Sequence, residues 1–173
     1  MLAFENQVSS QLSMQQLNSP VKILIVDDDE EDFLITSEYI KKIPGKKFMI
    51  DWCFAYDEAL NKICNSEYDI YFVDYLMSPK TGLELIEEVA LNSCDEPIIL
   101  LTGKGNHQVD IRAMQAGAFD YQIKTELSVE KMERCIRYAL GKTSSLKALK
   151  SSERKFRSFF PLPRCTILQT ILE

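Results

Sequence analysis

Several features that would assign the chain to a familiar class of protein are missing. No apolar run is long enough to span a bilayer, and residues 1–20 contain neither Lys nor Arg nor a sustained apolar stretch. A membrane anchor and a secretory signal are therefore not expected. The five cysteines are scattered and form no C-x-x-C pair, so neither a disulfide framework nor a zinc site is indicated. These absences favour a cytoplasmic protein without membrane contact.

The chain also lacks an excess of positive charge, and it has one histidine. The formal net charge is -6 at pH 7, so the chain lacks the excess of Lys and Arg that grips a nucleic-acid backbone, and nucleic-acid binding is not expected. The single histidine, His107, lies in the polar stretch GKGNH. We interpret it as a loop residue and not as a phosphoryl carrier. A length of 173 residues with 46% hydrophobic residues fits one globular domain with extra segments at its ends.

Strand and helix patterns alternate through the middle of the chain. Apolar runs typical of strands buried on both faces of a parallel sheet occur at 21–26, 48–55, 69–74, 97–102 and 118–124. Stretches with helical spacing follow them, at 32–43, 57–65, 83–91, 108–117 and from Ser128 onward. Five strand and helix pairs in succession predict right-handed crossovers. The expected fold is therefore α/β, with a doubly wound five-stranded parallel sheet of the flavodoxin-like class.

Polar side chains close successive predicted strands. Asp27 and Asp28 follow the first strand, Asp74 ends the third, Thr102 ends the fourth and Lys124 ends the fifth. Sites in open parallel sheets form beyond the carboxyl ends of the strands, so we expect these side chains to meet in one crevice. Crowded carboxylates repel one another unless a cation lies among them, and oxygen ligands favour Mg²⁺. A hydroxyl and an ammonium could then stabilise a phosphoryl group transferred to an aspartate.

The segments VDDDEED, FVDYLMSPKTGLELI, LLTGKG and AGAFDYQIK together resemble the receiver domains of response regulators. The resemblance implies that Asp28 binds Mg²⁺ directly and that Asp27 acts on it through water. It also implies that Asp74 is the phosphate acceptor and a metal ligand, and that the main-chain carbonyl of Leu76 completes the protein's share of the metal shell. The phosphoryl group would come from a phosphohistidine on a sensor histidine kinase or a histidine phosphotransfer protein.

The same resemblance assigns roles to three further residues. Thr102 and Lys124 would bond the phosphoryl group once it is on the acceptor, and Tyr121 matches the aromatic residue that swings inward afterwards. The added charge could then repack the surface made by the fourth helix, the fifth strand and the fifth helix. The domain would be a signalling module that catalyses its own phosphorylation and dephosphorylation, and not an enzyme acting on other substrates.

Three positions near the expected site depart from the family pattern or affect its kinetics. The family usually places a proline in a cis peptide after the lysine, whereas this chain has Thr125. Because a non-proline cis bond costs about 3 to 4 kcal/mol, we expect a trans bond or a locally different loop there. Leu76 and Lys104 flank the path by which water would attack the acyl phosphate. An apolar Leu76 should not orient that water, which predicts a long-lived phosphorylated state.

The two ends of the chain differ from its middle. Residues 1–20 are a polar leader rich in Gln, Ser and Asn, residues 21–140 form the predicted receiver domain, and residues 141–173 form a helical linker and tail. A loose heptad continues the last helix: Leu146, Leu149, Glu153, Phe156 and Phe160. This spacing predicts a signalling helix that could join two copies in a homodimer.

The tail also bears on what the complete protein does. ALKSSERKFRSFF resembles the lead-in of a PAS sensory domain, but the PLPRCTILQTILE that follows does not continue that pattern. We interpret the chain as the N-terminal part of a larger PAS-linked signalling protein, which could carry a kinase or cyclase output. A simple tail without an output region is the alternative.

Two other function classes fit part of the pattern. Asp27 and Asp29 form an Asp-x-Asp after the first strand, as in phosphatases of the haloacid dehalogenase type. Such phosphatases need a further acidic pair after a later strand, whereas here the third strand ends in a lone Asp74 and the fourth in Thr102. The other alternative is a receiver-like interaction module that is never phosphorylated. The intact set of polar residues argues against it.

Overall fold

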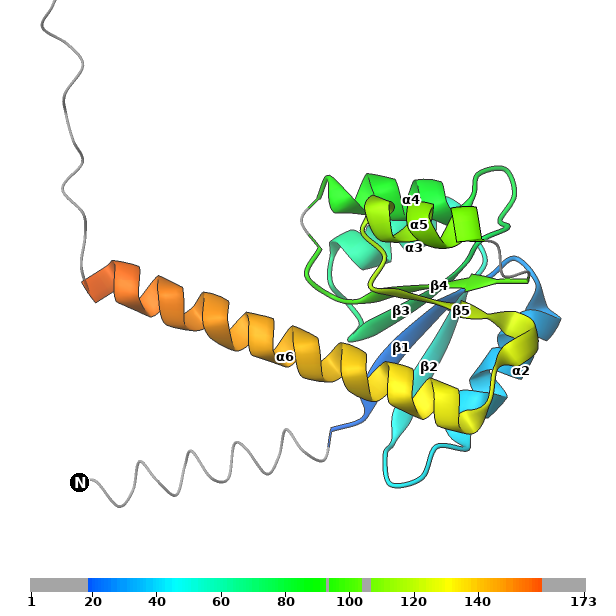
Figure 1. The fold of residues 1–173 in the computed structure, drawn as a ribbon, viewed down its shortest axis with the longest axis horizontal. Coiled ribbons are helices and arrows are strands. Elements are labelled where there is room, and N and C mark those ends of the chain that lie inside the picture. The colour runs from blue at the N-terminus through cyan, green and yellow to red at the C-terminus, as the bar shows by residue number, and fades with distance from the viewer. Residues whose placement is uncertain (1–18, 93, 104–106, 160–173) are drawn as a thin grey trace, which may run out of the picture.

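The computed structural model describes residues 19–92, 94–103 and 107–159 (Figure 1). Five strands form one sheet in the order β2-β1-β3-β4-β5, and every neighbouring pair is parallel. The strands are β1 (Val21–Val26), β2 (Phe48–Cys53), β3 (Ile70–Asp74), β4 (Ile98–Thr102) and β5 (Asp120–Ile123). This order, with helical connections between the strands, confirms the predicted doubly wound fold.

Helices cover both faces of the sheet. They are α2 (Glu30–Lys41), α3 (Tyr56–Cys64), α4 (Gly82–Ala90), α5 (His107–Ala116) and α6 (Val129–Phe159), with a short 3-10 helix η1 (Lys124–Glu126) before α6. In Figure 1, α3, α4 and α5 lie on one side of the strands, and α2 and α6 lie on the other. Two separate apolar cores, one on each face, result from this arrangement.

Alternation along the strands explains why the apolar runs in the sequence are continuous. Leu24 and Val26 of β1 belong to the core beneath α3, α4 and α5, whereas Ile23 and Ile25 belong to the core beneath α2 and α6. Successive side chains of a strand point to opposite faces, so a strand covered on both sides needs apolar residues at every position. All four side chains are completely buried.

Local chemistry determines where the elements next to the carboxyl ends of the strands begin. The Asp29 carboxylate caps α2 by accepting hydrogen bonds from the amides of Glu31 and Asp32. Thr81 caps α4 in a capping box with Glu84. A Cβ atom on Gly82 would lie 2.0 Å from the main-chain oxygen of Asp74, so only glycine lets α4 start this close to the end of β3.

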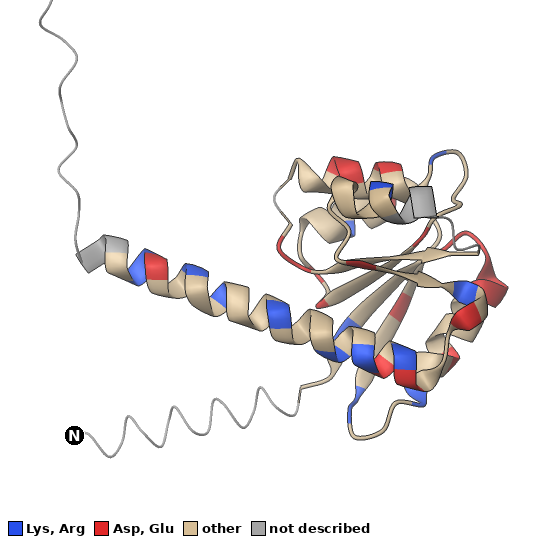
Figure 2. Cartoon of the chain, in the orientation of Figure 1, with Lys and Arg blue, Asp and Glu red and all other residues tan. Residues whose placement is uncertain are grey.

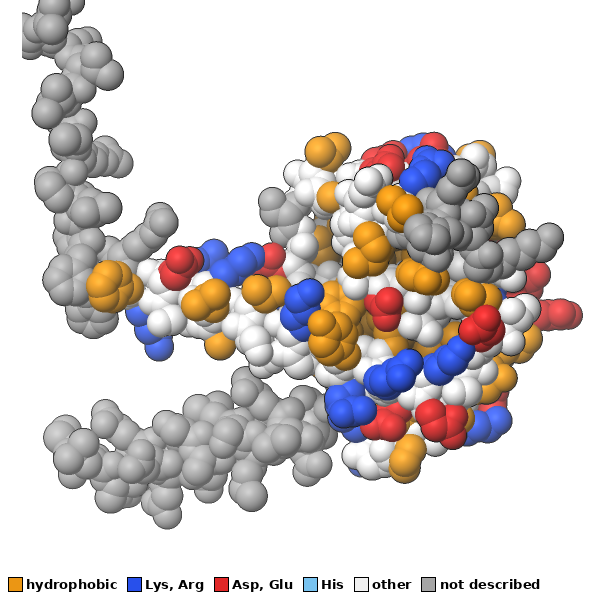
Figure 3. Space-filling view, viewed as in Figure 1, with side chains coloured by type: hydrophobic (Ala, Val, Ile, Leu, Met, Phe, Trp, Pro, Cys, Tyr) orange, Lys and Arg blue, Asp and Glu red, His pale blue; other side chains and the backbone are white. Residues whose placement is uncertain are grey.

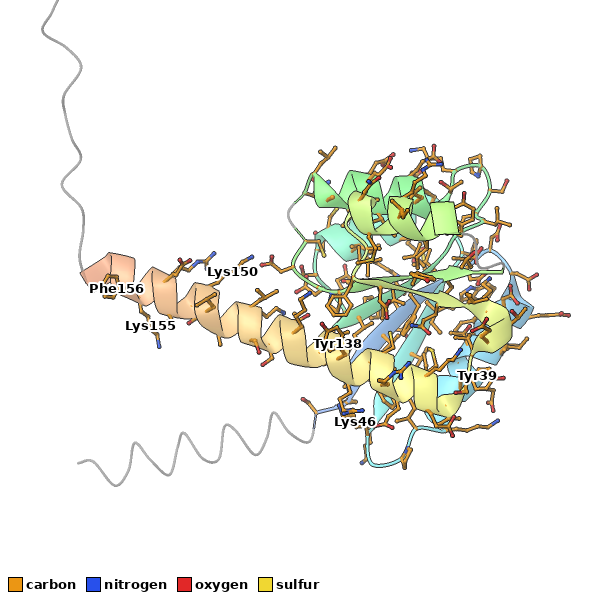
Figure 4. The ribbon with its side chains drawn as sticks, in the orientation of Figure 1. Tyr39, Lys46, Tyr138, Lys150, Lys155 and Phe156 are labelled. Carbon is orange, nitrogen blue, oxygen red and sulfur yellow. The ribbon has the colours of Figure 1, made fainter. Side chains whose placement is uncertain are left out.

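The last helix extends beyond the sheet. It continues through Gly141, as predicted, and its 31 residues correspond to a length of about 45 Å. Ser128 caps it by accepting a hydrogen bond from the amide of Lys131. Figure 4 shows Lys150 and Phe156 on the part of α6 beyond the strands. Within the described residues, no helix is both long and apolar enough to cross a membrane.

Several expectations need correction or lie outside the described residues. Lys124 opens η1 and is not the last residue of β5. Of the described cysteines, Cys53 and Cys135 are buried, Cys94 is half-buried and Cys64 is exposed. The side chain of His107 is outside the described part of the structure. So are residues 1–18 of the predicted leader, residue 93, residues 104–106 with Lys104, and residues 160–173 with Phe160.

Candidate functional site

The predicted polar residues meet at the carboxyl ends of the strands. Figure 2 shows acidic residues along the segment that joins β1 to α2, at the end of the sheet where β5 stops. Among the described residues, Asp27, Asp28 and Asp74 form a cluster in which one carboxylate oxygen of each lies within 4.8 Å of the others. Lys124 lies 2.6 Å from Asp74, measured from Nζ to Oδ1. Asp28, Asp74 and Lys124 therefore lie close enough to share one ligand.

Asp27 is held from both its main chain and its side chain. Its amide donates to the carbonyl of Cys53, and its carbonyl accepts a hydrogen bond of 2.8 Å from Nε1 of Trp52. The carboxylate accepts from the amide of Asp29 at 3.0 Å. Complete burial raises the pKa of Asp27, although hydrogen bonds from Lys124 and Asp29 partly offset that effect.

Asp74 is almost as enclosed as Asp27. Its Oδ2 accepts a hydrogen bond of 2.9 Å from the amide of Leu76, and its Oδ1 pairs with Lys124. Burial raises the pKa of Asp74 to about 6, despite the opposing effect of Lys124. Asp28 differs because it is exposed, and its Oδ2 accepts from the amide of Ser78 at 3.1 Å. The cluster therefore has two buried carboxylates and one that faces solvent.

Lys124 is the positive charge of the site. Its ammonium lies 2.9 Å from Oδ2 of Asp27, 2.7 Å from Oδ2 of Asp32 and 2.6 Å from Oδ1 of Asp74. Burial opposes the charge of this ammonium, but the hydrogen bonds to the three carboxylates outweigh it and raise the pKa of Lys124. Of the described peptide bonds, only Ser78–Pro79 is cis. The trans bond between Lys124 and Thr125 thus still allows the lysine to reach Asp74, as predicted.

The donor set fits a divalent cation. The ammonium of Lys124 contacts three carboxylates, those of Asp27, Asp32 and Asp74. Asp28 adds a fourth carboxylate to the cluster, so the local charge is negative. Only oxygen atoms are offered, which suits Mg²⁺ better than metals that prefer nitrogen or sulfur. Since Lys124 contacts only one oxygen each of Asp27 and Asp74, the other oxygens remain available to a metal. The residues present therefore fit the predicted cofactor.

The remaining predicted residues lie around this cluster. Thr102 is buried at the end of β4 and is paired in register with Ile123, directly before the lysine. Leu76 is 70% exposed, and its amide donates to Oδ2 of Asp74. Tyr121 is half-buried in β5, opposite Leu100, and lines a cavity of about 420 Å³ with residues of α5. Tyr121 thus lies where a change at β4 could reach the α5 surface.

Asp32 was missed as a site residue. In the sequence it is one of several carboxylates in the first turn of a helix, and such charges usually interact with solvent and the helix dipole. Its contact with Lys124 depends on how α2 docks beside η1, and the two residues are 92 positions apart. The helical position of Asp32 was visible in the sequence, but no local signal indicated its partner.

Comparison with known proteins agrees with this geometry. The sheet order and the polar cluster at its edge are those of a receiver-type signalling domain. The chain belongs to the response regulator receiver domain family, whose model matches residues 23–136. It functions as the receiver module of a two-component signalling system. The phosphatase reading is not favoured, since β3 ends in a single aspartate and the relatives are response regulators.

Individual relatives are similar at moderate identity. The chain is 31% identical over 111 residues to the transcriptional regulatory protein ResD of Bacillus subtilis, covering 64% of this chain and 44% of ResD. It is 27% identical over 124 residues to the two-component response regulator PhoP of Pseudomonas aeruginosa, covering 72% and 53%. The chain thus spans about half the length of the curated relatives it matches.

A solved receiver structure supports the fold. The crystal structure of a CheY-like response regulator receiver domain protein from Methanospirillum hungatei JF-1 matches with a TM-score of 0.63 at 23% identity. The match covers 73% of this chain and 98% of that chain. The receiver fold therefore accounts for most of the chain, and the match to the family model ends at residue 136, within α6.

Proposed function

We propose that Asp74 accepts a phosphoryl group from a phosphohistidine of a sensor histidine kinase or a histidine phosphotransfer protein. A carboxylate oxygen of Asp74 would form the new bond to phosphorus as the bond to the histidine nitrogen breaks, and the histidine leaves with that electron pair. The observation that carries the proposal is the ammonium of Lys124 at 2.6 Å from Asp74. A buried carboxylate beside a fixed cation can act as a nucleophile whose product charge is stabilised.

The surrounding residues would have separate tasks. Lys124 and the hydroxyl of Thr102 would hydrogen-bond the phosphoryl oxygens, and the amide of Leu76 already orients Asp74. Asp27, Asp28, Asp74 and the main-chain carbonyl of Leu76 would hold Mg²⁺. When bound, this ion neutralises negative charge on the carboxylates and the phosphoryl group. The domain would thereby catalyse its own phosphorylation and dephosphorylation.

The signal would leave through the surface made by α5, β5 and α6. Thr102 moving toward the modified aspartate would draw Tyr121 inward, because β4 and β5 are adjacent. On that surface Tyr138 is 63% exposed, and it lines a groove with Arg134 and Lys142. Figure 3 shows apolar and basic side chains alternating along α6. A partner or output region would read the state of the site there.

We also propose roles for the ends of the chain. Residues 141–173 would link the receiver domain to an output region such as a PAS domain, in a cytoplasmic protein whose complete form could carry a kinase or cyclase. Leu146, Leu149 and Phe156 are exposed on α6 at heptad spacing, which supports a homodimer through that helix. Basic residues flank these apolar positions on α6, so the dimer should strengthen as salt is raised. Sedimentation at two ionic strengths would show this change.

Incubation with Mg²⁺ and acetyl phosphate, followed by intact mass measurement, tests the central proposal. The unmodified chain should gain one phosphoryl group, and Asp74→Asn should gain none. Asp57→Asn is the matched control, because Asp57 is an exposed aspartate in the first turn of α3, and it should be modified like the wild type. Equal labelling of Asp74→Asn would overturn the assignment. Turnover of a generic phosphomonoester that requires Asp27 would instead support the phosphatase alternative.

A further inference from the structure

Lys124 uses all of its hydrogen-bond donors before any phosphoryl group arrives. An ammonium has three N–H donors, and here they reach Asp27, Asp32 and Asp74. Two of these partners belong to the cluster that fits a metal, whereas Asp32 does not. Asp32 therefore binds the lysine without contributing to the metal site.

The position of Asp32 is set by the start of α2. Asp29 caps the helix and accepts from the Asp32 amide, which directs the third helical residue toward η1. The Asp32 side chain is 40% exposed, compared with 7% for Asp74. The Asp32 carboxylate thus lies at the solvent edge of the site.

We infer that Asp32 competes with the phosphoryl group for Lys124 and thereby lowers the affinity of the site for phosphoryl. This inference rests on the proposed function of Asp74. A phosphoryl group on Asp74 needs N–H donors and positive charge from Lys124, and one donor is already engaged by Asp32. Asp32 also adds a negative charge that repels the phosphoryl oxygens without adding any cation. Both effects disfavour the phosphorylated state, so the site releases its phosphoryl group more readily than it would without Asp32.

Beryllofluoride binding provides a direct measurement, because BeF₃⁻ on a carboxylate stands in for the phosphoryl group. The titration uses the full chain with saturating Mg²⁺, followed by fluorescence and independently by calorimetry. Trp52 is the single tryptophan, and its Nε1 donates to the carbonyl of Asp27, so it reports from beside the site. Asp32→Asn should bind BeF₃⁻ about tenfold more tightly than the wild type, which corresponds to about 1.4 kcal/mol.

A matched control separates this effect from a general change in charge. Glu31 precedes Asp32 in the same helical turn, is exposed and is not one of the three ion-pair partners of Lys124. Glu31→Gln should therefore bind BeF₃⁻ within twofold of the wild type. Asp32→Ala should tighten binding at least as much as Asp32→Asn, and added salt should shrink the difference from the wild type. Damage to the fold would not tighten binding.

The outcomes distinguish the two levels of the proposal. Unchanged or weaker binding by Asp32→Asn, or weaker binding by Asp32→Ala, would show that Asp32 supports the lysine, and the inference would be wrong while the role of Asp74 stands. Equal tightening of BeF₃⁻ binding by Glu31→Gln would show that only the net charge matters, and it would also overturn the inference. A wild-type chain that neither binds BeF₃⁻ nor reacts with acetyl phosphate would overturn both the inference and the proposed function.

Discussion

Two clusters of lysine and carboxylate lie at opposite ends of the sheet, and they differ in how well their charges are balanced. At the carboxyl ends of the strands, one ammonium is shared by Asp27, Asp32 and Asp74. At the other end, directly before β4, Glu96 pairs with Lys147 of α6 at 3.0 Å. The first cluster has too little positive charge, whereas the second has a partner for each charge.

The two ends also differ in the direction of their pKa shifts. Burial raises the pKa of Asp74 to about 6. Burial also acts to raise the pKa of Glu96, whose side chain is only 8% exposed, but hydrogen bonds from Ser66, Lys147 and Cys94 outweigh it and lower the pKa. A buried carboxylate with enough donors stabilises the fold. A buried carboxylate with too few donors is poised to bind a cation or to react.

The largest expected effect is a gain of stability from Asp74→Asn in the absence of metal. A shift of the Asp74 pKa from 3.8 to about 6 corresponds to about 3 kcal/mol at about 1.36 kcal/mol per unit. Because the folded-state pKa of Asp74 is raised, the wild type has these roughly 3 kcal/mol of stability in full below about pH 4 and loses them as the pH rises through about 6. Asp74→Asn should therefore raise the free energy of unfolding at pH 8 and change it little at pH 4.

Urea denaturation at both pH values measures this difference. Mg²⁺ should raise the stability of the wild type at pH 8 more than that of Asp74→Asn, because binding to the folded state stabilises it. Equal stability of the two proteins at pH 8 without metal would show that Lys124 already balances the cluster, and the contrast between the two ends would disappear.

Glu96→Ala should have the next largest effect, with the opposite sign. Loss of this carboxylate leaves the hydroxyl of Ser66 and the ammonium of Lys147 without their acceptor, so we expect a loss of about 2 kcal/mol. Because the folded-state pKa of Glu96 is lowered, its stabilisation is present above the ordinary pKa of 4.5 and is lost as the pH falls below it. Urea denaturation at pH 7 and pH 4 tests both points. Glu38→Ala, an exposed glutamate in a surface ion pair, should cost under about 0.5 kcal/mol.

Leu76→Asn should act only at the end of the sheet that holds Asp74. The Leu76 side chain is 70% exposed beside the acceptor, and an asparagine amide there could orient an attacking water. We expect the phosphorylated protein to lose its phosphoryl group about fivefold faster, which corresponds to about 1 kcal/mol. The decay of the phosphorylated mass with time measures this rate. Leu91→Asn, at an 86% exposed leucine away from the site, is the control, and equal decay of all three proteins would reject the role of Leu76.

Lys150→Ala should have the smallest effect. Lys150 pairs with Asp95, but both side chains are about half exposed, so the expected cost is under about 0.5 kcal/mol. Lys147→Ala should cost more, because it leaves the Glu96 carboxylate, on a side chain that is only 8% exposed, without its cation. Comparison of the two variants by thermal denaturation tests whether burial of the carboxylate determines the value of an ion pair at this end. Equal losses would contradict that interpretation.

Much of the fold could be predicted from local patterns. The strands were recognisable because burial on both faces requires continuous apolar runs, as in β1 and β4. The ends of the elements were predicted less well, since they depend on contacts such as the close approach of Gly82 to Asp74. The position of Lys124 in η1, after the end of β5, is another such case. Periodicity therefore predicted the existence of elements better than their limits.

The sequence by itself determined the succession of strands and helices along the chain and the polar residues at or just after the strand ends, because alternation of apolar runs and turn residues is a local property. It thereby determined that Asp27, Asp74 and Lys124 would share one edge of a parallel sheet. Only the tertiary structure decided that Asp32 joins them and that Glu96 holds α6 through Lys147. Both contacts join residues far apart in the chain, and they depend on how a helix docks against the sheet, which no local pattern encodes.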